Sequence, residues 1–231
     1  MATARSTRCS GWAPRPRLRR WLRVDLHLHT SASFDCSEPP ASVARRCRSL
    51  GLDPVFITDH DSIEGALELQ RAGDARIVVG EEILTADGEL IGLFLNAPVP
   101  VGLSALETAS RIHDQGGIVY LQHPYDTRRR ALSEEAMEAI AEAVDAVEVF
   151  NGRSPAESNR RAQELRDTLG VPAGAGSDAH QVGEIGRAFV EMSPFDGPRD
   201  FLVKLHEARV VVGRHRWRQL LEARLRRSGE V

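Results

Sequence analysis

Short runs of β-prone residues alternate with stretches of helical pattern along most of this chain, and this alternation constrains the fold more than any other feature. Strands are predicted over 24–29, 54–58, 76–80, 90–95, 117–121, 146–150 and 171–175, and helices over 41–50, 63–69, 104–115 and 155–169. Such alternation indicates βαβ units and a mostly parallel sheet, whose right-handed crossovers bring the carboxyl ends of the strands to one face. Two closing strands are expected over 187–192 and 210–212.

Histidines or acids stand at the carboxyl ends of five of these strands. In the first strand, apolar and polar residues alternate, so Leu26 and Leu28 are sent to one face and His27 and His29 to the other. Two adjacent buried imidazoles need water or a shared cation, because unpartnered polar groups are costly to bury. The sequence therefore predicts a metal site at the mouth of the sheet, where α/β folds place their chemistry.

Each candidate ligand alone is weak evidence for a metal site, because a lone histidine more often has a structural role with its hydrogen bonds satisfied. Together the candidates are strong evidence. His113, His206 and His215 lie within or beside helical, charged stretches and are interpreted as structural. Imidazole and carboxylate groups in this number could hold two or three divalent ions. The predicted metal ligands are His27, His29, Asp35, His60, Glu82, Glu89, His123, Asp178 and His180.

Length and composition bound the remaining possibilities. A chain of 231 residues can bury one substantial core, so residues 21–231 are expected to form a single domain. Residues 1–20 are basic and are expected to be a disordered tail, with a phosphate- or nucleic-acid-binding arm and an organelle transit peptide as the alternatives. The Arg-rich end from about residue 214 is expected to be a solvated helix rather than a nucleic-acid site.

Three further observations exclude other classes of protein. The net charge of −3 and the aromatic content of 5% argue against a stacking surface for single-stranded nucleic acid. The three cysteines are odd in number and lack CxxC spacing, which favours a reducing compartment. Because no apolar run approaches the length that spans a bilayer, we expect a soluble cytoplasmic protein that does not contact a membrane.

Five motifs occur in one order along the chain: DLHLHTSASFD, ITDHDSIEG, GEEI, LQHPYD and GSDAH. This series resembles the PHP family (polymerase and histidinol phosphatase) of metal-dependent phosphoesterases, and the resemblance spans roughly residues 24–212. It implies an α/β fold, a distorted (β/α)7 TIM-like barrel of the PHP type. It also implies a cluster of two or three metals at the carboxyl ends of the strands.

The resemblance implies a role for each matching position. His27 and His29 would bind one metal together with Asp178, Glu82 would bridge it to a second metal held by His123, and Asp35, His60 and His180 would hold a third. Many members have a histidine near Glu89, so Glu89 is expected either to be a harder oxygen ligand or to leave the second metal loosely held. Strand alternation is expected to point Glu81 away from the site.

Other residues near the site have two interpretations each. Asp25 and Asp59 are expected either to orient ligand imidazoles or to be ordinary strand-end acids. Arg128, Arg129 and Arg153 are candidates for binding a substrate phosphate, with a solvated surface role as the alternative. Asp178 and His180 are the candidate catalytic residues, because they can exchange protons as well as bind metal.

Clustered cations suit phosphoester hydrolysis, because they bind phosphoryl oxygens, lower the pKa of a water and stabilise the leaving oxygen. Imidazole and carboxylate ligands suit Mn, Fe or Zn. The predicted function is hydrolysis of a phosphate mono- or diester, with a phosphorylated small molecule or nucleotide as substrate and a short oligonucleotide as a further candidate. No obligate protein partner is evident. The alternatives are a catalytically silent PHP binding or regulatory module and an amidohydrolase-like C–N hydrolase.

Overall fold

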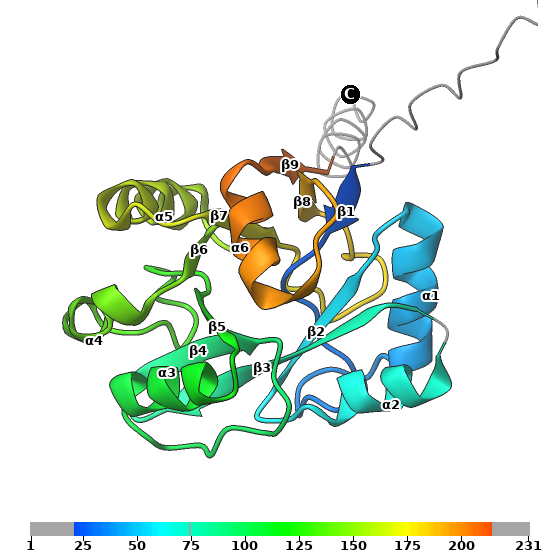
Figure 1. Ribbon diagram of the computed structural model, residues 1–231, viewed down its shortest axis with the longest axis horizontal. Helices are drawn as coiled ribbons and strands as arrows, with labels where there is room; N and C mark the ends of the chain where they lie inside the picture. The colour runs from blue at the N-terminus through cyan, green and yellow to red at the C-terminus, as the bar shows by residue number, and fades with distance from the viewer. Residues whose placement is uncertain (1–20, 74, 214–231) are drawn as a thin grey trace, which may run out of the picture.

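The computed structural model describes residues 21–73 and 75–213 (Figure 1). Its larger sheet is curled and has six strands hydrogen-bonded in sequence order: β2 (Val55–His60), β3 (Ile77–Thr85), β4 (Gly88–Leu93), β5 (Ile118–Leu121), β6 (Ala146–Asn151) and β7 (Ala173–Gly176). A smaller sheet has the order β1-β8-β9, with β1 (Leu22–Val24), β8 (Ala188–Met192) and β9 (Arg209–Val212). The basic segments 1–20 and 214–231, for which a tail and a helix were predicted, lie outside the described residues.

The larger sheet is mostly parallel, as predicted, with one antiparallel strand inserted. β2 pairs parallel with β3, and the pairs β5–β6 and β6–β7 are also parallel. β4 is antiparallel to both β3 and β5. Only Ala86 and Asp87 connect β3 to β4, and so short a turn can join only antiparallel neighbours.

The strand predicted over 24–29 is wrong in its bounds, since β1 ends at Val24 and the following residues continue as an extended segment. This segment lies between the two edge strands of the larger sheet. The Leu26 amide donates to the Ala175 carbonyl at 3.2 Å on β7, and the Thr58 amide on β2 donates to the Leu28 carbonyl at 2.9 Å. The backbone hydrogen bonds of residues 25–29 are divided between β7 and β2, so the segment is not a regular strand. It nevertheless links β7 to β2 and continues the curl of the barrel.

A second difference concerns β3, which was predicted to end at Gly80. The strand runs on to Thr85, so Glu81 and Glu82 lie within it, and Glu82 is paired in register with His60 of β2. The hairpin with β4 extends the strand, because residues 80–85 all find partners across the turn. The candidate acid is therefore held on a rigid strand rather than on a loop.

The four helices predicted within the described residues are present and surround the curled sheet: α1 (Pro40–Leu50), α2 (Glu64–Ala72), α3 (Ala105–Asp114) and α5 (Ala156–Leu169). α1 begins with proline at its first position and ends at Gly51, which adopts a left-handed conformation, φ 72°. No described helix is both long and apolar enough to cross a membrane.

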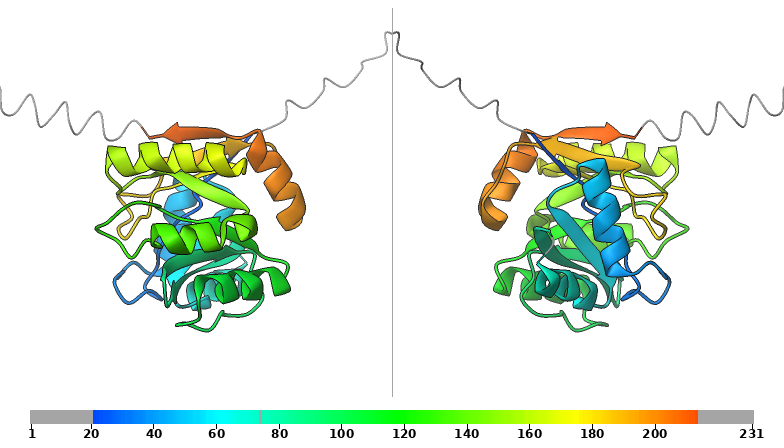
Figure 2. Two further views of the ribbon diagram at one scale, coloured as in Figure 1. Left: turned by 90° about the vertical axis from the view of Figure 1, so that its left-hand side faces the viewer. Right: turned by 90° about the vertical axis from the view of Figure 1, so that its right-hand side faces the viewer.

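Two short helices and one longer helix were not predicted: α4 (Glu134–Ala139), η1 (Ala141–Ala143) and α6 (Gly197–His206). In both views of Figure 2, α6 is the orange helix at the outer side of the molecule. Its Phe201 is fully buried against Phe56 of β2, with ring centroids 5.4 Å apart. α6 thus covers apolar surface of β2.

Candidate metal centre

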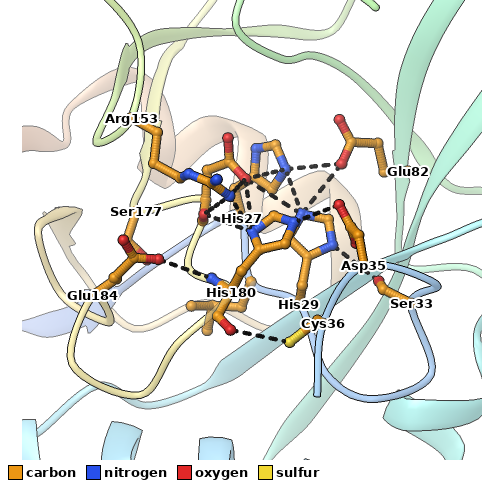
Figure 3. A network of polar contacts seen from close by, with 12 residues as sticks. His27, His29, Ser33, Asp35, Cys36, Glu82, Arg153, Ser177, His180 and Glu184 are labelled. Carbon is orange, nitrogen blue, oxygen red and sulfur yellow. Dashed lines mark hydrogen bonds and ion pairs between the residues drawn. The ribbon is translucent and has the colours of Figure 1, made fainter. Parts of the chain in front are cut away.

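Two histidines from the extended segment 25–29 form the centre of the site (Figure 3). The side chains of His27 and His29 are buried, and their Nε2 atoms lie only 3.1 Å apart. Both nitrogens face the same carboxylate oxygen, Oε2 of Glu82, at 3.1 Å and 3.3 Å. Three such atoms converging on one point are arranged to share a cation.

Glu82 connects four of the candidate histidines. Besides His27 and His29, its Oε2 lies 3.5 Å from Nδ1 of His60, and its Oε1 lies 3.0 Å from Nε2 of His123. Burial would raise the pKa of Glu82, but the charge of His27 and hydrogen bonds from His123 outweigh this and hold the pKa well below its ordinary value. Glu82 is therefore an ionised carboxylate at the middle of the cluster.

Asp178 follows β7 and faces the same cluster from the other side. Its Oδ1 lies 3.5 Å from both His29 Nε2 and His180 Nδ1, and it makes no hydrogen bond within the described chain although it is buried. Asp178 also has a positive φ of 52°, and the candidate ligand His123 has a φ of 27°. Uncommon conformations of this kind concentrate at functional sites.

A third group lies nearer the surface. Asp35, in the turn after the histidine segment, places its Oδ2 3.0 Å from His180 Nε2 and 3.6 Å from His60 Nε2. Burial lowers the pKa of His60 and of His180. Both rings are thus biased toward the neutral form that binds metal.

Glu89 belongs to the cluster as well. Its Oε1 lies 3.7 Å from His60 Nδ1 and 4.0 Å from a guanidinium nitrogen of Arg130. Burial, together with the nearby charge of Glu82, raises the pKa of Glu89 to about 7. A second carboxylate so close to Glu82 is expected to ionise fully only when a cation offsets the repulsion.

The nine predicted ligands therefore converge, and the structure divides them into four overlapping groups. In each group the possible ligand atoms lie within 4.8 Å of one another. The membership differs from the three sets that the resemblance implies, because Glu89 is grouped with His60 and Glu82, and His123 with His27 and Asp178. The groups are His27, His29 and Glu82; His27, His123 and Asp178; His60, Glu82 and Glu89; and His29, Asp35, His60 and His180.

The electrostatics of the site fit bound cations. Burial would lower the pKa of His27, but Glu82, Glu148 and Asp178 hold it well above its ordinary value. Burial would also lower the pKa of His29, but the neighbouring carboxylates of Asp178 and Glu82 outweigh this effect and raise the pKa to about 9. The pocket thus favours positive charge, and its nitrogen and oxygen donors suit a divalent transition metal; one of them, Oδ1 of Asp178, has no hydrogen-bond partner among the described residues.

Glu148 of β6 supports the cluster and was not predicted. Its Oε1 lies 3.2 Å from Nδ1 of His27, on the side of the ring opposite Glu82. Its Oε2 accepts the His123 amide at 2.9 Å and the Asn151 side-chain amide at 3.0 Å, and Asn151 also donates to Asp178 at 3.2 Å. One buried carboxylate therefore sets the positions of three candidate ligands. A single acid within the apolar run Ala146–Phe150 was the signal that could have found it.

Replacing Glu148 with glutamine is expected to lower metal affinity or activity by about 10–100-fold, the scale on which partners of metal-binding histidines act. The glutamine side chain keeps the shape of glutamate but lacks the negative charge of the carboxylate that lies beside the His27 ring. Competition with a chromogenic chelator measures the affinity. An affinity equal to that of the wild type would show that Glu148 is only a buried structural acid.

The two acids predicted beside ligands have different contacts. Asp59 accepts from the Ser33 hydroxyl at 3.0 Å, and Ser33 Oγ lies 3.1 Å from Nδ1 of His29, so Asp59 reaches a ring through one hydroxyl group. Asp25 accepts from the backbone amides of Ser177 and Gly186, at 2.8 Å and 3.1 Å, and thus holds backbone rather than an imidazole.

Glu81 points away from the cluster, as strand alternation predicts. Its Oε2 accepts the Val99 amide at 2.8 Å, and its Oε1 has no hydrogen bond within the described chain. Burial raises the pKa of Glu81 to about 7. Glu81 and Glu82 are therefore a matched pair of buried acids, of which only Glu82 contacts the histidines.

The three candidate phosphate-binding arginines are placed differently. The guanidinium of Arg129 lies 2.8 Å from Asp178 Oδ2, and that of Arg153 lies 3.7 Å from Asp178 Oδ1 and also contacts His180. Arg128 instead binds Asp126 through two contacts of 3.1 Å and donates to the Arg153 carbonyl. Arg129 and Arg153 thus reach the cluster, whereas Arg128 links the two loops that carry them.

The curled α/β sheet and its histidine–carboxylate cluster are the features of a metal-dependent barrel enzyme. A sequence model of the PHP domain matches residues 25–144, and a model described as PHP-associated matches residues 156–210. The chain therefore belongs to the PHP domain family of metal-dependent hydrolases, which confirms the resemblance seen in the sequence.

The chain is also similar to individual proteins and to solved structures. The chain is 37% identical over 143 residues to the uncharacterized protein MJ1587 of Methanocaldococcus jannaschii, covering 56% of this chain and 82% of that protein. It is 34% identical over 194 residues to MJ0417 of the same organism, covering 78% of each. The fold is similar to that of a two-domain protein from Bacteroides vulgatus containing a predicted PHP-like metal-dependent phosphoesterase, with a TM-score of 0.70, 17% identity, and coverage of 90% of this chain and 70% of that chain.

Proposed function

We propose that this chain hydrolyses a phosphate mono- or diester, with two or three divalent ions of Mn, Fe or Zn. The observation that carries the proposal is the approach of two guanidinium groups, those of Arg129 and Arg153, to Asp178 beside the ligand groups. A phosphoryl group is anionic and needs cationic partners beyond the metals, and the arginine fork matches its oxygens. A neutral amide substrate has no such requirement.

The residues present fit a role as metal ligands. His27, His29 and Glu82 would hold one ion, with His123, Asp178, His60 and Glu89 available to a second and Asp35 and His180 to a third. Bound divalent ions supply Lewis acidity for the phosphoryl oxygens and lower the pKa of an attacking water. The protein contributes a largely buried donor set held on strands and on the segments that adjoin them.

Asp178 and His180 are proposed to carry out the proton transfers. His180 is partly exposed at the mouth, where a leaving group would stand, and its Nδ1 lies 3.5 Å from Asp178 Oδ1. Burial, assisted by the charge of His29, lowers the pKa of His180. A neutral imidazole at this position can accept a proton from water or substrate.

A C–N hydrolase is less well supported than a phosphoesterase by the charged residues of this chain. Amidohydrolase barrels commonly bridge their metals with a lysine, and the sequence contains one lysine, Lys204. Lys204 lies on α6, and its ammonium nitrogen is 3.7 Å from Asp200. The central position between histidines is taken by Glu82 instead.

The test begins with elemental analysis of the untagged protein. Hydrolysis is then assayed with an aryl phosphate, a bis-aryl phosphate and a panel of amides, each in the presence of Mn, Fe or Zn ions. Two or three equivalents of metal with hydrolysis of either phosphate would support the proposal. Hydrolysis of the amides alone would replace it with the C–N hydrolase. Absence of both metal and activity would identify a silent binding module.

Replacing Arg129 with methionine is expected to raise the KM for the phosphate substrate by about 10-fold or more, since a charge-assisted hydrogen bond to phosphate would be lost. Arg128→Met is the matched control from the same loop, because Arg128 is engaged by Asp126. Steady-state kinetics on both variants makes the comparison. Equal KM values for Arg129→Met and the wild type would remove Arg129 from the phosphate site.

A further inference from the structure

A pocket of about 260 Å³ lies immediately beside the proposed phosphate site. Arg129 belongs to both places, because its side chain lines the pocket while its guanidinium contacts Asp178 at 2.8 Å. The pocket floor is apolar and includes Leu132 and Met137, which are buried. A group attached to a phosphate at the metal centre would therefore reach this pocket past Arg129.

One wall of the pocket is a stack of a guanidinium on an aromatic ring. The Arg161 guanidinium carbon lies 3.7 Å from the centre of the Tyr125 ring. The loop that carries Tyr125 is fixed, since Ser158 of α5 donates to the Tyr125 carbonyl at 3.1 Å. Flat aromatic and guanidinium surfaces are those on which nucleic-acid bases stack in proteins.

Three polar side chains around the pocket, those of Asp126, Ser133 and Glu134, already have partners. The Asp126 carboxylate is held by Arg128, and the Glu134 carboxylate by Arg161. The Ser133 hydroxyl accepts the Ala136 amide at the start of α4, at 3.1 Å. A polyhydroxylated group such as a sugar would find few free acceptors here, whereas a planar ring would find apolar floor and a stacking wall.

We propose that this pocket binds the planar heteroaromatic part, of the nucleobase kind, of a phosphate monoester whose phosphoryl group lies at the metal centre. The inference rests on the proposed phosphoester hydrolysis and narrows its substrate. The pocket is smaller than the roughly 300–1,000 Å³ of sites for drug-sized ligands, so it accommodates one ring system. A mononucleotide fits this description better than a phosphorylated sugar.

The test compares adenosine 5′-monophosphate with ribose 5-phosphate, which share the scissile phosphate and differ in the base. With the metal-loaded full chain, kcat/KM is expected to favour the nucleotide by about 10-fold or more, the scale of one stacked base. Arg161→Met is expected to raise the KM for the nucleotide several-fold more than that for ribose 5-phosphate. Thr127→Trp, at an exposed position of the pocket rim, is expected to do the same by filling the space.

Arg160→Met is the matched control on the same helix. Arg160 pairs with Glu157 and Glu164 outside the pocket, so both substrates should be unaffected. Equal kcat/KM for the two substrates in the wild type, or equal losses in Arg161→Met, would overturn the proposal. It would also be overturned if Phe34→Ala alone caused the selective loss, because Phe34 is 73% exposed beside His60 and would then be the base platform.

A binding measurement separates this proposal from the proposed hydrolysis. If neither phosphate is hydrolysed, calorimetric titration with adenosine and with ribose still reports on the pocket. Binding of adenosine that is weakened in Arg161→Met and retained in Arg160→Met would support the pocket while the hydrolytic function fails. Absence of adenosine binding in the wild type would overturn the pocket as a base site.

Discussion

Replacing Glu82 with glutamine is expected to reduce phosphoester hydrolysis by more than about 100-fold, beyond the range that loss of a ligand's outer partner causes. The substitution keeps the volume of the side chain but removes the charge that faces four imidazoles, two of them at 3.1 Å and 3.0 Å. The bound metal measured by elemental analysis should fall by at least one equivalent. Both effects follow because Glu82 belongs to two of the four ligand groups.

Glu81→Gln supplies the control for this experiment. Glu81 is the preceding residue on β3 and is equally buried, but its carboxylate accepts the Val99 amide, a bond that the oxygen of glutamine can replace. Metal content and activity close to wild type are expected. If Glu81→Gln lost metal and Glu82→Gln kept it, the assignment of the two acids would be reversed.

Removing metal by chelation is expected to abolish hydrolysis and lower the melting temperature by roughly 5–10 °C. A ligand present at about 100 times its Kd stabilises the folded state by about 2.7 kcal/mol, and each kcal/mol corresponds to roughly 2–4 °C for a domain of this size. Without cations, the buried carboxylates of Glu82 and Glu89 repel each other. Differential scanning calorimetry before and after dialysis against a chelator measures the shift.

The Glu82→Gln variant provides the control for chelation as well, because a site that has already lost metal should show a smaller shift. Addition of Mn, Fe or Zn to the chelated wild type should restore both activity and melting temperature. An unchanged melting temperature together with full activity after complete removal of metal would contradict the metal-dependent assignment.

Periodicity and turn residues predicted much of the fold. The Pro40 start and Gly51 end of α1 are local signals that act through fixed backbone angles, so both bounds were recovered. The arrangement of β4 depends on its neighbours, and α6 begins with Gly197 and Pro198, residues that are also typical of turns. The irregular backbone of residues 25–29 was also beyond local rules, since hydrogen bonds to Ala175 and Thr58 determine it.

The candidate site divides in the same way. His27, His60 and Asp178 could be selected from sequence because histidines and acids recur where strands end. Glu148 was missed because an acid within a strand gives no sign of its face or partner until β6 and the histidine segment are placed side by side. The different contacts of Arg128 and Arg129 likewise depend on the path of their loop, which two neighbouring arginines in a sequence do not specify.

The position of residues 25–29 between β7 and β2 has a consequence for the order of events during protein synthesis. His27 and His29 are made early, but the strand that holds their segment on one side, β7, is among the last to be made. These side chains are therefore fixed only after β7 has been made, and metal loading is expected to follow that step. A chain ending at residue 170 would keep His27, His29 and Glu82 yet is expected to retain no metal in equilibrium dialysis.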